Sequence, residues 1–226
     1  MVTQKIHTVA ASEPTSKPGI DRHLPALFVG DSPAMDFLNS IATPVDETID
    51  WITDGRGFLD WLGQAQLVPA DVLDALGKHA RPGEFDKVAR QARDLRDWFR
   101  GFVLDHIERP LSAKDLRELE RLNRILERGE SYCKIVPRDN TRSASLRMRI
   151  VQRWDSPDAL LIPIAETLAR FVCTDDILNV KACQRHPCTL LFVDRTRGRA
   201  RRWCSMAVCG NRAKQATHRN RIKTDQ

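Results

Sequence analysis

Four cysteines near the C-terminal end constrain the fold of this chain more than any other feature of its sequence. Cys183 and Cys188 enclose four residues, Cys204 and Cys209 also enclose four, and fifteen residues separate the two pairs. Because residues 1–23 contain no continuous apolar segment of the signal-peptide type, we place the protein in the cytoplasm, where clustered cysteines are more often metal ligands than disulfides. Four thiolates suit a closed tetrahedral site, so these cysteines are expected to bind one structural Zn²⁺ ion.

The segments between and after the cysteine pairs have the pattern of a small unit held together by a metal. Residues 189–194 (TLLFVD) predict a short strand, residues 195–199 (RTRGR) a glycine-containing turn, and residues 200–204 (ARRWC) a returning strand. A helix is predicted to open at Gly210 and to deliver the last ligand from its first turn. A cysteine knuckle, a hairpin and a helix in this order predict a treble-clef zinc finger. So small a unit needs a bound metal to be stable.

Three further side chains of metal-binding type are assigned other roles. His186 lies inside the first cysteine pair and is an alternative ligand. With four cysteines present, we expect it to donate a hydrogen bond near the site or to be exposed. Cys133 and Cys173 lie in apolar surroundings far from the cluster, and both are expected to be buried core thiols.

The C-terminal block resembles the CGNR zinc finger, a family named for the tetrapeptide found here at residues 209–212. The resemblance rests on both cysteine pairs, on LLFVD before the turn, on RRWC around the third cysteine and on CGNRAKQATHRNR. Residues 27–44 (LFVGDSPAMDFLNSIATP) are similar to the opening of the ABATE domain, where a Leu-Asp-Phe-x-Asn-Thr stretch is usual and residues 35–40 here read MDFLNS. Together the two resemblances span roughly residues 24–222 and imply a bacterial, stress-induced regulator of transcription.

Hydrophobic periodicity predicts helices over most of the remaining chain. Apolar residues recur every three or four positions over residues 84–110 and 112–129, and in shorter runs after Pro33, Gly55 and Pro157. Capping residues precede several of these runs, and the patterns therefore predict a helical body with short connections.

One part of the body has the period of a strand instead of a helix. Residues 132–139 and 143–154 alternate apolar and polar side chains, which predicts a two-stranded hairpin. We therefore expect a mainly α protein with a small β component. It is divided into a flexible leader (1–23), a helical ABATE-like domain with a small hairpin (24–178) and a treble-clef-like zinc finger (179–226).

Positive charge is concentrated in the same C-terminal block as the cysteines. The span from Lys181 to Gln226 holds twelve Lys and Arg residues but two acidic ones, whereas the rest of the chain holds 24 basic and 28 acidic residues. This asymmetry predicts a polyanionic partner, most simply duplex DNA. About two or three cations suffice to offset the negative charge of a four-thiolate zinc site, so the surplus is expected to contact phosphates. The residues assigned to this surface are Arg195, Arg197, Arg199, Arg212, Lys214, His218, Arg219 and Arg221.

The helical body is expected to sense a ligand or to form a dimer. Asp36 and Asn39 lie three positions apart and are assigned to a pocket for a small-molecule effector; the alternative is that they bridge neighbouring backbone segments. Because a single finger offers a small DNA footprint, we expect a homodimer formed through the helical body.

Several function classes are not supported by the sequence. No run of about 18 apolar residues is present to span a membrane. His106 is interpreted as a lone surface residue of a helix, and no catalytic set, phosphate-binding glycine loop or nucleophile elbow is found. We therefore expect neither a membrane protein nor an enzyme. The sequence predicts a zinc-binding, DNA-binding transcription regulator; the alternative is an RNA-binding or protein-interaction adaptor whose zinc is purely structural.

Overall fold

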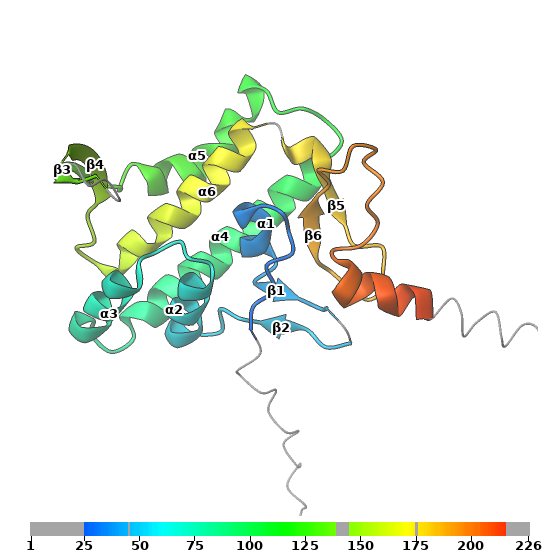
Figure 1. Cartoon of the computed structure of the whole chain (residues 1–226), viewed down its shortest axis with the longest axis horizontal. Coiled ribbons are helices and arrows are strands. Elements are labelled where there is room, and N and C mark those ends of the chain that lie inside the picture. Colours follow the sequence, from blue (N-terminus) through cyan, green and yellow to red (C-terminus); the bar gives the residue numbers. More distant parts are fainter. Residues whose placement is uncertain (1–24, 45, 139–144, 175, 216–226) are drawn as a thin grey trace, which may run out of the picture.

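A computed structural model describes residues 25–44, 46–138, 145–174 and 176–215, and it confirms a mainly helical protein with a small β component (Figure 1). The helices are α1 (Pro33–Leu38), α2 (Gly55–Gln64), α3 (Ala70–His79), α4 (Glu84–His106), α5 (Leu116–Leu126) and α6 (Leu161–Cys173), with short 3₁₀ turns at Ala113–Asp115, Pro157–Leu160 and Asp176–Asn179. The strands form three antiparallel pairs: β1 (Ile41–Ala42) with β2 (Ile49–Asp50), β3 (Ser131–Pro137) with β4 (Leu146–Gln152), and β5 (Val180–Ala182) with β6 (Leu191–Val193).

Two helices begin at the capping residues that the sequence predicts. Asp54 precedes α2, and its Oδ1 accepts a hydrogen bond from the backbone N–H of Gly57 at 2.8 Å. A capping box precedes α5. There Oδ2 of Asp115 accepts from the backbone N–H of Ser112 at 2.7 Å, and Ser112 Oγ accepts from the backbone N–H of Lys114 at 3.3 Å.

The core of the body is built on α4, against which α1 and α2 pack. Its buried face recurs at helical spacing and consists of Val88, Ala89, Ala92, Leu95, Phe99, Phe102 and Val103. Leu191 and Val193 of β6 belong to the same buried cluster, although they come from the predicted finger. The C-terminal unit therefore completes the core of the body and is not an appendage to it.

A buried ion pair joins α4 to β2. Arg96 is 1% exposed and donates from Nη1 and Nη2 to the two carboxylate oxygens of Asp50, each at 2.9 Å. Its Nη1 also donates to Ser40 Oγ at 3.1 Å, and its Nε donates to the exposed Asp97 at 3.1 Å. Removing a guanidinium from water costs free energy. Here hydrogen bonds to two carboxylates offset that cost, and the pair with Asp50 is bidentate.

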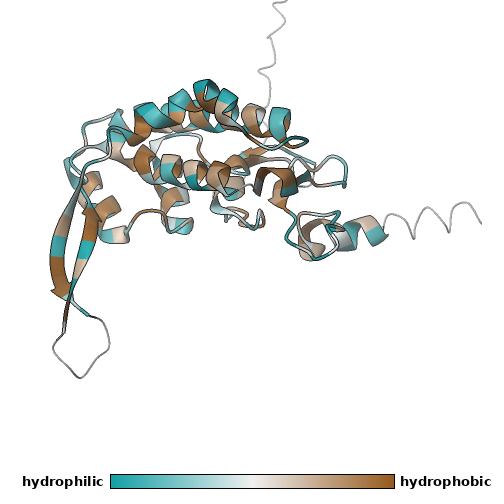
Figure 2. Cartoon of the chain, turned by 90° about the horizontal axis from the view of Figure 1, so that it is seen from above, coloured by the Kyte–Doolittle hydropathy of each residue, from teal (hydrophilic) through white to brown (hydrophobic). Residues whose placement is uncertain are grey.

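The β3–β4 hairpin projects from the body at the opposite end of the molecule from the last helical residues of the chain (Figures 1 and 2). Its register pairs Cys133 with Ile150, Ile135 with Met148, and Pro137 with Leu146. Since alternate residues of a strand share a face, these six side chains form one face, which we call the apolar face. All six are exposed, and the side chains of Ile135, Met148 and Ile150 are 70 to 71% exposed.

The strand that pairs with β6 differs from the one that the sequence pattern predicts. Residues 200–204 are not a strand, and β6 pairs instead with β5, which precedes the first cysteine. The reason is that the backbone N–H of Arg201 is bound by the Asp194 carboxylate at 3.0 Å, while the Arg202 carbonyl accepts from the backbone N–H of Gln184 at 2.9 Å. The returning segment therefore crosses the cysteine knuckle instead of lying along β6.

The prediction that Cys133 and Cys173 are buried core thiols is wrong, because both are exposed. Cys133 belongs to the apolar face of the hairpin, which no other described helix or strand covers. Cys173 is the last residue of α6, where the helix has already left the core.

Candidate metal centre

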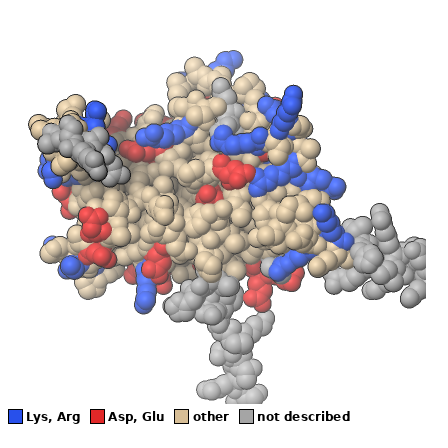
Figure 3. All heavy atoms as spheres, viewed as in Figure 1, with Lys and Arg blue, Asp and Glu red and all other residues tan. Residues whose placement is uncertain are grey.

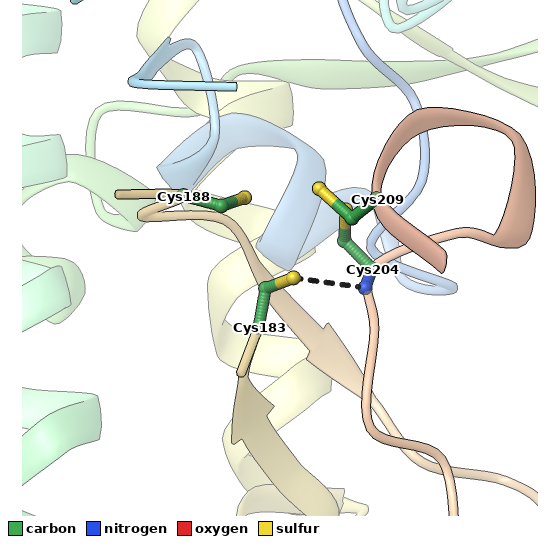
Figure 4. A group of neighbouring side chains, drawn as sticks. All are labelled: Cys183, Cys188, Cys204 and Cys209. Carbon is green, nitrogen blue, oxygen red and sulfur yellow. Dashed lines mark hydrogen bonds between the residues drawn. The ribbon is translucent and has the colours of Figure 1, made fainter. Parts of the chain in front are cut away.

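Two loops and one helical turn bring the four predicted cysteines together. Cys183 follows β5, Cys188 lies in the loop before β6, Cys204 lies in the crossing segment, and Cys209 belongs to a π-helical turn at Met206–Gly210. Their Sγ atoms all lie within 4.8 Å of one another, and Figure 4 shows the four side chains pointing toward a common centre. The side chains of Cys183, Cys204 and Cys209 are buried, and that of Cys188 is half-buried. His186, which lies between Cys183 and Cys188 in the sequence, is exposed, and exposure is one of the two alternatives predicted for it.

The turn that carries Cys209 begins earlier than the sequence pattern predicts. Ser205 caps it, because its Oγ accepts from the backbone N–H of Val208 at 2.9 Å and its carbonyl accepts from those of Cys209 and Gly210 at 3.1 and 3.0 Å. A Cβ atom at Gly210 would lie 2.6 Å from the sulfur of Met206, so a larger residue here requires the exposed Met206 side chain to move aside. The helix therefore starts after Ser205 and continues through residues 211–215.

The donor set fits one zinc ion. Zn–S bonds of about 2.3 Å in a tetrahedron place sulfur atoms about 3.8 Å apart, which small side-chain rotations reach from the present spacing. All four cysteines are free thiols. The backbone N–H of Cys204 already donates to Sγ of Cys183 at 3.4 Å (Figure 4), which stabilises negative charge on that sulfur.

Three of the four thiols influence one another's protonation. Hydrogen bonds from Cys188 and from Cys204 hold the pKa of the Cys183 thiol far below its usual range. The hydrogen bond to Cys183 in turn raises the pKa of Cys188 to about 12 and that of Cys204 further. Negative charge on Cys183 therefore disfavours negative charge on these two neighbours, and a divalent cation bound among the cysteines offsets that repulsion.

Side chains of the body hold the cysteine unit in place. The Asn39 side chain donates to the Leu191 carbonyl at 2.8 Å and accepts from the Leu191 N–H at 2.9 Å. Arg100 of α4 donates to the carbonyl oxygen of Thr189, and Thr189 Oγ1 accepts from the backbone N–H of Thr43 at 2.8 Å. The position of the metal centre is therefore fixed relative to the helices.

Asp36 and Asn39, which the sequence assigns to an effector pocket, both bridge backbone segments. Both polar atoms of the Asn39 amide bind Leu191, and Asp36 Oδ1 accepts from the backbone N–H of Gly30 at 2.9 Å. Burial raises the pKa of Asp36 to about 6. The bridging alternative accounts for these contacts, and the effector pocket stays a prediction.

A cleft of about 200 Å³ lies elsewhere, between α5, α6 and the base of the hairpin, where it is lined by Ile125, Glu130, Arg153 and Ile162 among others.

Arg201 binds the N-terminal segment of the body to the cysteine unit. Its guanidinium lies 4.2 Å above the Phe192 ring and donates to the carbonyl oxygens of Val29 at 3.1 Å and Trp203 at 2.9 Å. It also contacts the Asp31 carboxylate and the carbonyl oxygen of Cys204. Arg201 therefore has a structural role beside one of the cysteines.

Asp194 shapes the turn that follows β6. This buried carboxylate accepts from Lys181 Nζ at 2.7 Å, from Thr196 Oγ1 at 2.6 Å and from the backbone N–H groups of Thr196 and Arg201, each at 3.0 Å. Burial alone raises the pKa of Asp194, but these hydrogen bonds outweigh it and hold the pKa well below its usual range. The ionised carboxylate therefore fixes the turn whose other side chains face solvent.

Five of the eight residues assigned to the nucleic-acid surface are described, and all five are exposed. They are Arg195, Arg197 and Arg199 on the turn, and Arg212 and Lys214 on the helix. Arg195 Nε also donates to the carbonyl oxygen of Asp31 at 3.4 Å. Figure 3 shows Lys and Arg side chains gathered over the side of the molecule that carries the cysteine unit. The other three residues, His218, Arg219 and Arg221, lie outside the described residues.

A second group of metal-binding side chains escapes sequence analysis. His106, Asp115 and Glu118 lie together where α4 is followed by α5. The interpretation of His106 as a surface residue is wrong, because it is 3% exposed. The Ser112–Asp115 spacing is that of a capping box, so Asp115 can be recognised in the sequence as a capping residue. The sequence does not indicate that this residue contacts the end of α4.

Comparison with known protein families agrees with the observed geometry. The ABATE family model, whose description is "Putative stress-induced transcription regulator", matches residues 31–175, and the CGNR zinc finger model matches residues 179–222. None of the curated proteins compared with the chain matches it. The zinc-finger match includes the cysteine cluster, which is therefore the site of one structural zinc ion. Neither description is that of an enzyme, and within the described ranges every helix is too short or too polar to span a bilayer.

Proposed function

This chain belongs to the ABATE family and carries a CGNR zinc finger, and we propose that it is a bacterial, cytoplasmic transcription regulator, induced by stress, that binds duplex DNA through the finger. We assign the zinc ligands to Cys183, Cys188, Cys204 and Cys209, whose sulfur atoms converge. In this proposal the zinc is structural, because four thiolates leave no open coordination position for a substrate. The protein acts by binding and not by catalysis.

The observation that carries the proposal is a difference between two sets of cations in the finger. One set is used within the protein: Lys181 binds Asp194, Arg185 donates to the Pro44 carbonyl at 3.3 Å, and Arg202 donates to Gln184 at 2.7 Å. Arg201 completes this set. The cations of this set are engaged in contacts within the chain.

The second set consists of the exposed turn and helix residues. Because Asp194 and the zinc knuckle hold the backbone beneath them, Arg197, Arg199, Arg212 and Lys214 are presented on a fixed surface. Cations on a rigid surface gain affinity for a phosphate backbone through counterion release. The positive charge and the fixed position of this set suit contacts with the phosphates of a DNA backbone. We include Arg195, His218, Arg219 and Arg221 in the proposed DNA-binding surface.

Trp203 favours a duplex over a single strand as the partner. Its ring is half-buried and packs against the cysteine cluster, and Arg202 lies over it at 5.3 Å. These contacts engage the ring within the protein, which disfavours its use as a stacking platform for unpaired bases. An RNA-binding or protein-interaction adaptor remains the alternative function, and competition by single-stranded RNA of equal length distinguishes it from the proposal.

The decisive experiment compares two triple variants that remove the same charge. Arg197→Ala, Arg212→Ala and Lys214→Ala together alter the proposed surface. Arg56→Ala, Lys78→Ala and Arg90→Ala together alter exposed positions on α2, α3 and α4. Fluorescence anisotropy with a labelled duplex is recorded between about 50 and 200 mM salt.

We expect the first variant to bind more weakly and its salt slope to fall by about 2 to 3, because each phosphate contact contributes about 0.9 to that slope. The control variant is expected to keep the wild-type slope, and both must retain one zinc per chain. No binding at low salt, binding insensitive to salt, or equal losses in the two variants would contradict DNA binding through this surface.

We also propose that the protein forms the predicted homodimer through one part of its body, the apolar face of the β3–β4 hairpin. A two-stranded hairpin is marginally stable alone in water, and this one exposes three apolar cross-strand pairs. Its other face carries Lys134, Arg147 and Arg149, which are exposed and charged. A second copy covers the apolar face without burying a charge, because the face is free of ionised groups and is self-complementary in an isologous contact.

The position of the hairpin suits this arrangement. It lies at the end of the molecule remote from the finger (Figure 1), so a dimer joined through the hairpins carries its fingers at its two outer ends. Two fingers bound to two half-sites supply the footprint that one finger lacks.

A further inference from the structure

The junction of α4 and α5 encloses a histidine nitrogen that has no hydrogen-bond partner in the described part of the chain. His106 is 3% exposed, and its Nδ1 lies 2.7 Å from the carbonyl oxygen of Phe102. Its ring stacks on the Phe102 ring with centroids 4.3 Å apart, which fixes its orientation. Because a carbonyl oxygen accepts only, this contact places a proton on Nδ1, and in the neutral tautomer that follows Nε2 carries the lone pair.

Two carboxylates face this lone pair. Asp115 Oδ1 lies 3.6 Å from His106 Nε2, and Glu118 Oε1 lies 3.8 Å from it. Both distances are too long for hydrogen bonds, and three acceptor atoms repel one another unless positive charge lies between them. Donor atoms bound at 2.0–2.2 Å to one tetrahedral ion are about 3.3 to 3.6 Å apart, so the two distances from Nε2 are already close to those between ligands of one cation. All three atoms lie within 4.8 Å of one another.

We propose that His106, Asp115 and Glu118 bind a divalent transition-metal ion, of which Zn²⁺ is the best fit, at a second site separate from the cysteine cluster. One imidazole and two carboxylates are donors that suit this ion. The side chain of Glu118 is 55% exposed, so the ion reaches the site from solvent and water completes its coordination. The ion ties the C-terminal end of α4 to the N-terminal end of α5.

The surroundings of Asp115 prepare it as a ligand. Arg109 donates to Oδ1 at 2.7 Å and to Oδ2 at 3.1 Å, and Ser112 N–H donates to Oδ2 at 2.7 Å. These donors favour the ionised form of the Asp115 carboxylate. Oδ1 keeps a second lone pair for the metal, and a guanidinium bound to a ligating carboxylate orients it. Two carboxylates and one guanidinium leave a net negative charge that a dication offsets.

Calorimetric titration with Zn²⁺ tests the site in the full chain, starting from protein whose finger already holds one zinc. The matched variants are Glu118→Gln and Glu120→Gln, which change two exposed residues of α5. Glu118 faces His106, whereas Glu120 Oε1 lies 3.7 Å from Arg124 Nε. We expect wild type and Glu120→Gln to bind a second equivalent with equal affinity. Glu118→Gln is expected to bind it at least about 10-fold more weakly, because a ligand is lost.

A second measurement keeps the proposal independent of folding effects at the buried histidine. In ¹⁵N spectra of the wild type, the His106 Nε2 resonance is expected to shift on addition of Zn²⁺, and His106→Gln is expected to abolish the second equivalent. The proposal is overturned if the wild type takes up one zinc only, or if the two glutamate variants bind equally. It is also overturned if Nε2 responds to pH but not to zinc, because a proton then occupies the space between the three side chains. DNA binding enters none of these readouts.

Discussion

Asn39 and Leu191 are joined by two hydrogen bonds across 152 residues of sequence: Asn39 Nδ2 donates to the Leu191 carbonyl at 2.8 Å, and the Leu191 N–H donates to Asn39 Oδ1 at 2.9 Å. Each residue is 1% exposed. The amide of one side chain thus takes the place of a neighbouring strand beside β6, and it links the first helix of the body to the zinc finger.

Replacement of this amide is expected to destabilise the whole protein. Asn39→Ala leaves a buried peptide N–H and a buried carbonyl unpaired, and each costs about 1–3 kcal/mol. Urea denaturation is therefore expected to show a loss of about 2–6 kcal/mol. The exposed Asn123 on α5 supplies the control, Asn123→Ala, for which little change is expected. A loss below about 1 kcal/mol for Asn39→Ala would show that water or another group replaces the amide.

The zinc content of cysteine variants is expected to depend on whether the cysteine lies in the cluster. Cys204→Ser removes a buried thiol of the cluster and is expected to lower zinc well below one per chain and to lower the melting temperature. Cys133→Ser and Cys173→Ser change exposed thiols and are expected to keep one zinc per chain. Elemental analysis after dialysis measures this. A Cys204→Ser protein that keeps one zinc per chain would contradict the assignment of Cys204 as a ligand.

Asp36 makes stability depend on pH in a specific window. Its pKa rises from 3.8 to about 6 on folding, mainly because of burial. The folded state then holds a proton that the unfolded state has lost, so this carboxyl destabilises the fold as the pH rises from about 4 through about 6. Asp36→Asn removes that term. We expect the variant to gain about 1–2 kcal/mol relative to wild type over this window, after allowance for partial exposure.

The control for this pH dependence is Asp60→Asn on the exposed side of α2. Stability is measured by urea denaturation at a series of pH values. If the difference between Asp36→Asn and wild type stays constant between pH 4 and 7, burial does not govern the protonation of Asp36.

The two carboxylates around Arg96 are expected to differ in importance. Asp50→Asn removes the bidentate partner of a guanidinium that is 1% exposed, and an uncompensated buried charge costs about 3–5 kcal/mol. Asp97→Asn removes a partner whose side chain is 65% exposed, and the expected cost is below about 1 kcal/mol. Denaturation curves of the two variants compare these costs directly. Equal losses would mean that solvent screens both pairs alike.

The hairpin carries a matched test of dimer formation. Ile135 and Met148 are cross-strand partners on the apolar face, and Lys134 and Arg149 are partners on the opposite face. Replacement of the first pair by serine is expected to shift the protein from dimer to monomer in analytical ultracentrifugation, whereas replacement of the second pair leaves the dimer. A wild-type protein that stays monomeric at high micromolar concentration excludes this interface.

Local signals explain which parts of the structure are predictable from the sequence. The starts of α2 and α5 follow from Asp54 and Ser112, whose side chains cap the turn directly ahead of them. The partner of β6 is not predictable in this way. Residues 200–204 have a suitable pattern, but Asp194 binds the Arg201 backbone, and that contact exists only once the turn is folded.

The same distinction applies to the two clusters of metal-binding residues. Cysteine spacing encodes the zinc finger within about 30 residues, so it is visible in the sequence. His106 and Asp115 come from the end of one helix and the cap of the next, and their proximity depends on how α4 and α5 pack. Cys133 was mispredicted for a related reason: alternation shows which side chains share a face, but it does not show whether anything covers that face.

Strand β6 also bears on how such proteins evolve. Leu191 and Val193 belong to the core of the body, while Phe192 between them packs with the cysteines. A recombination event that moved the finger alone to another gene would separate Leu191 from Asn39 and would leave both products with an exposed apolar surface. A chain divided between the body and the finger is therefore expected to be less stable than the intact protein, because each part loses buried contacts with the other.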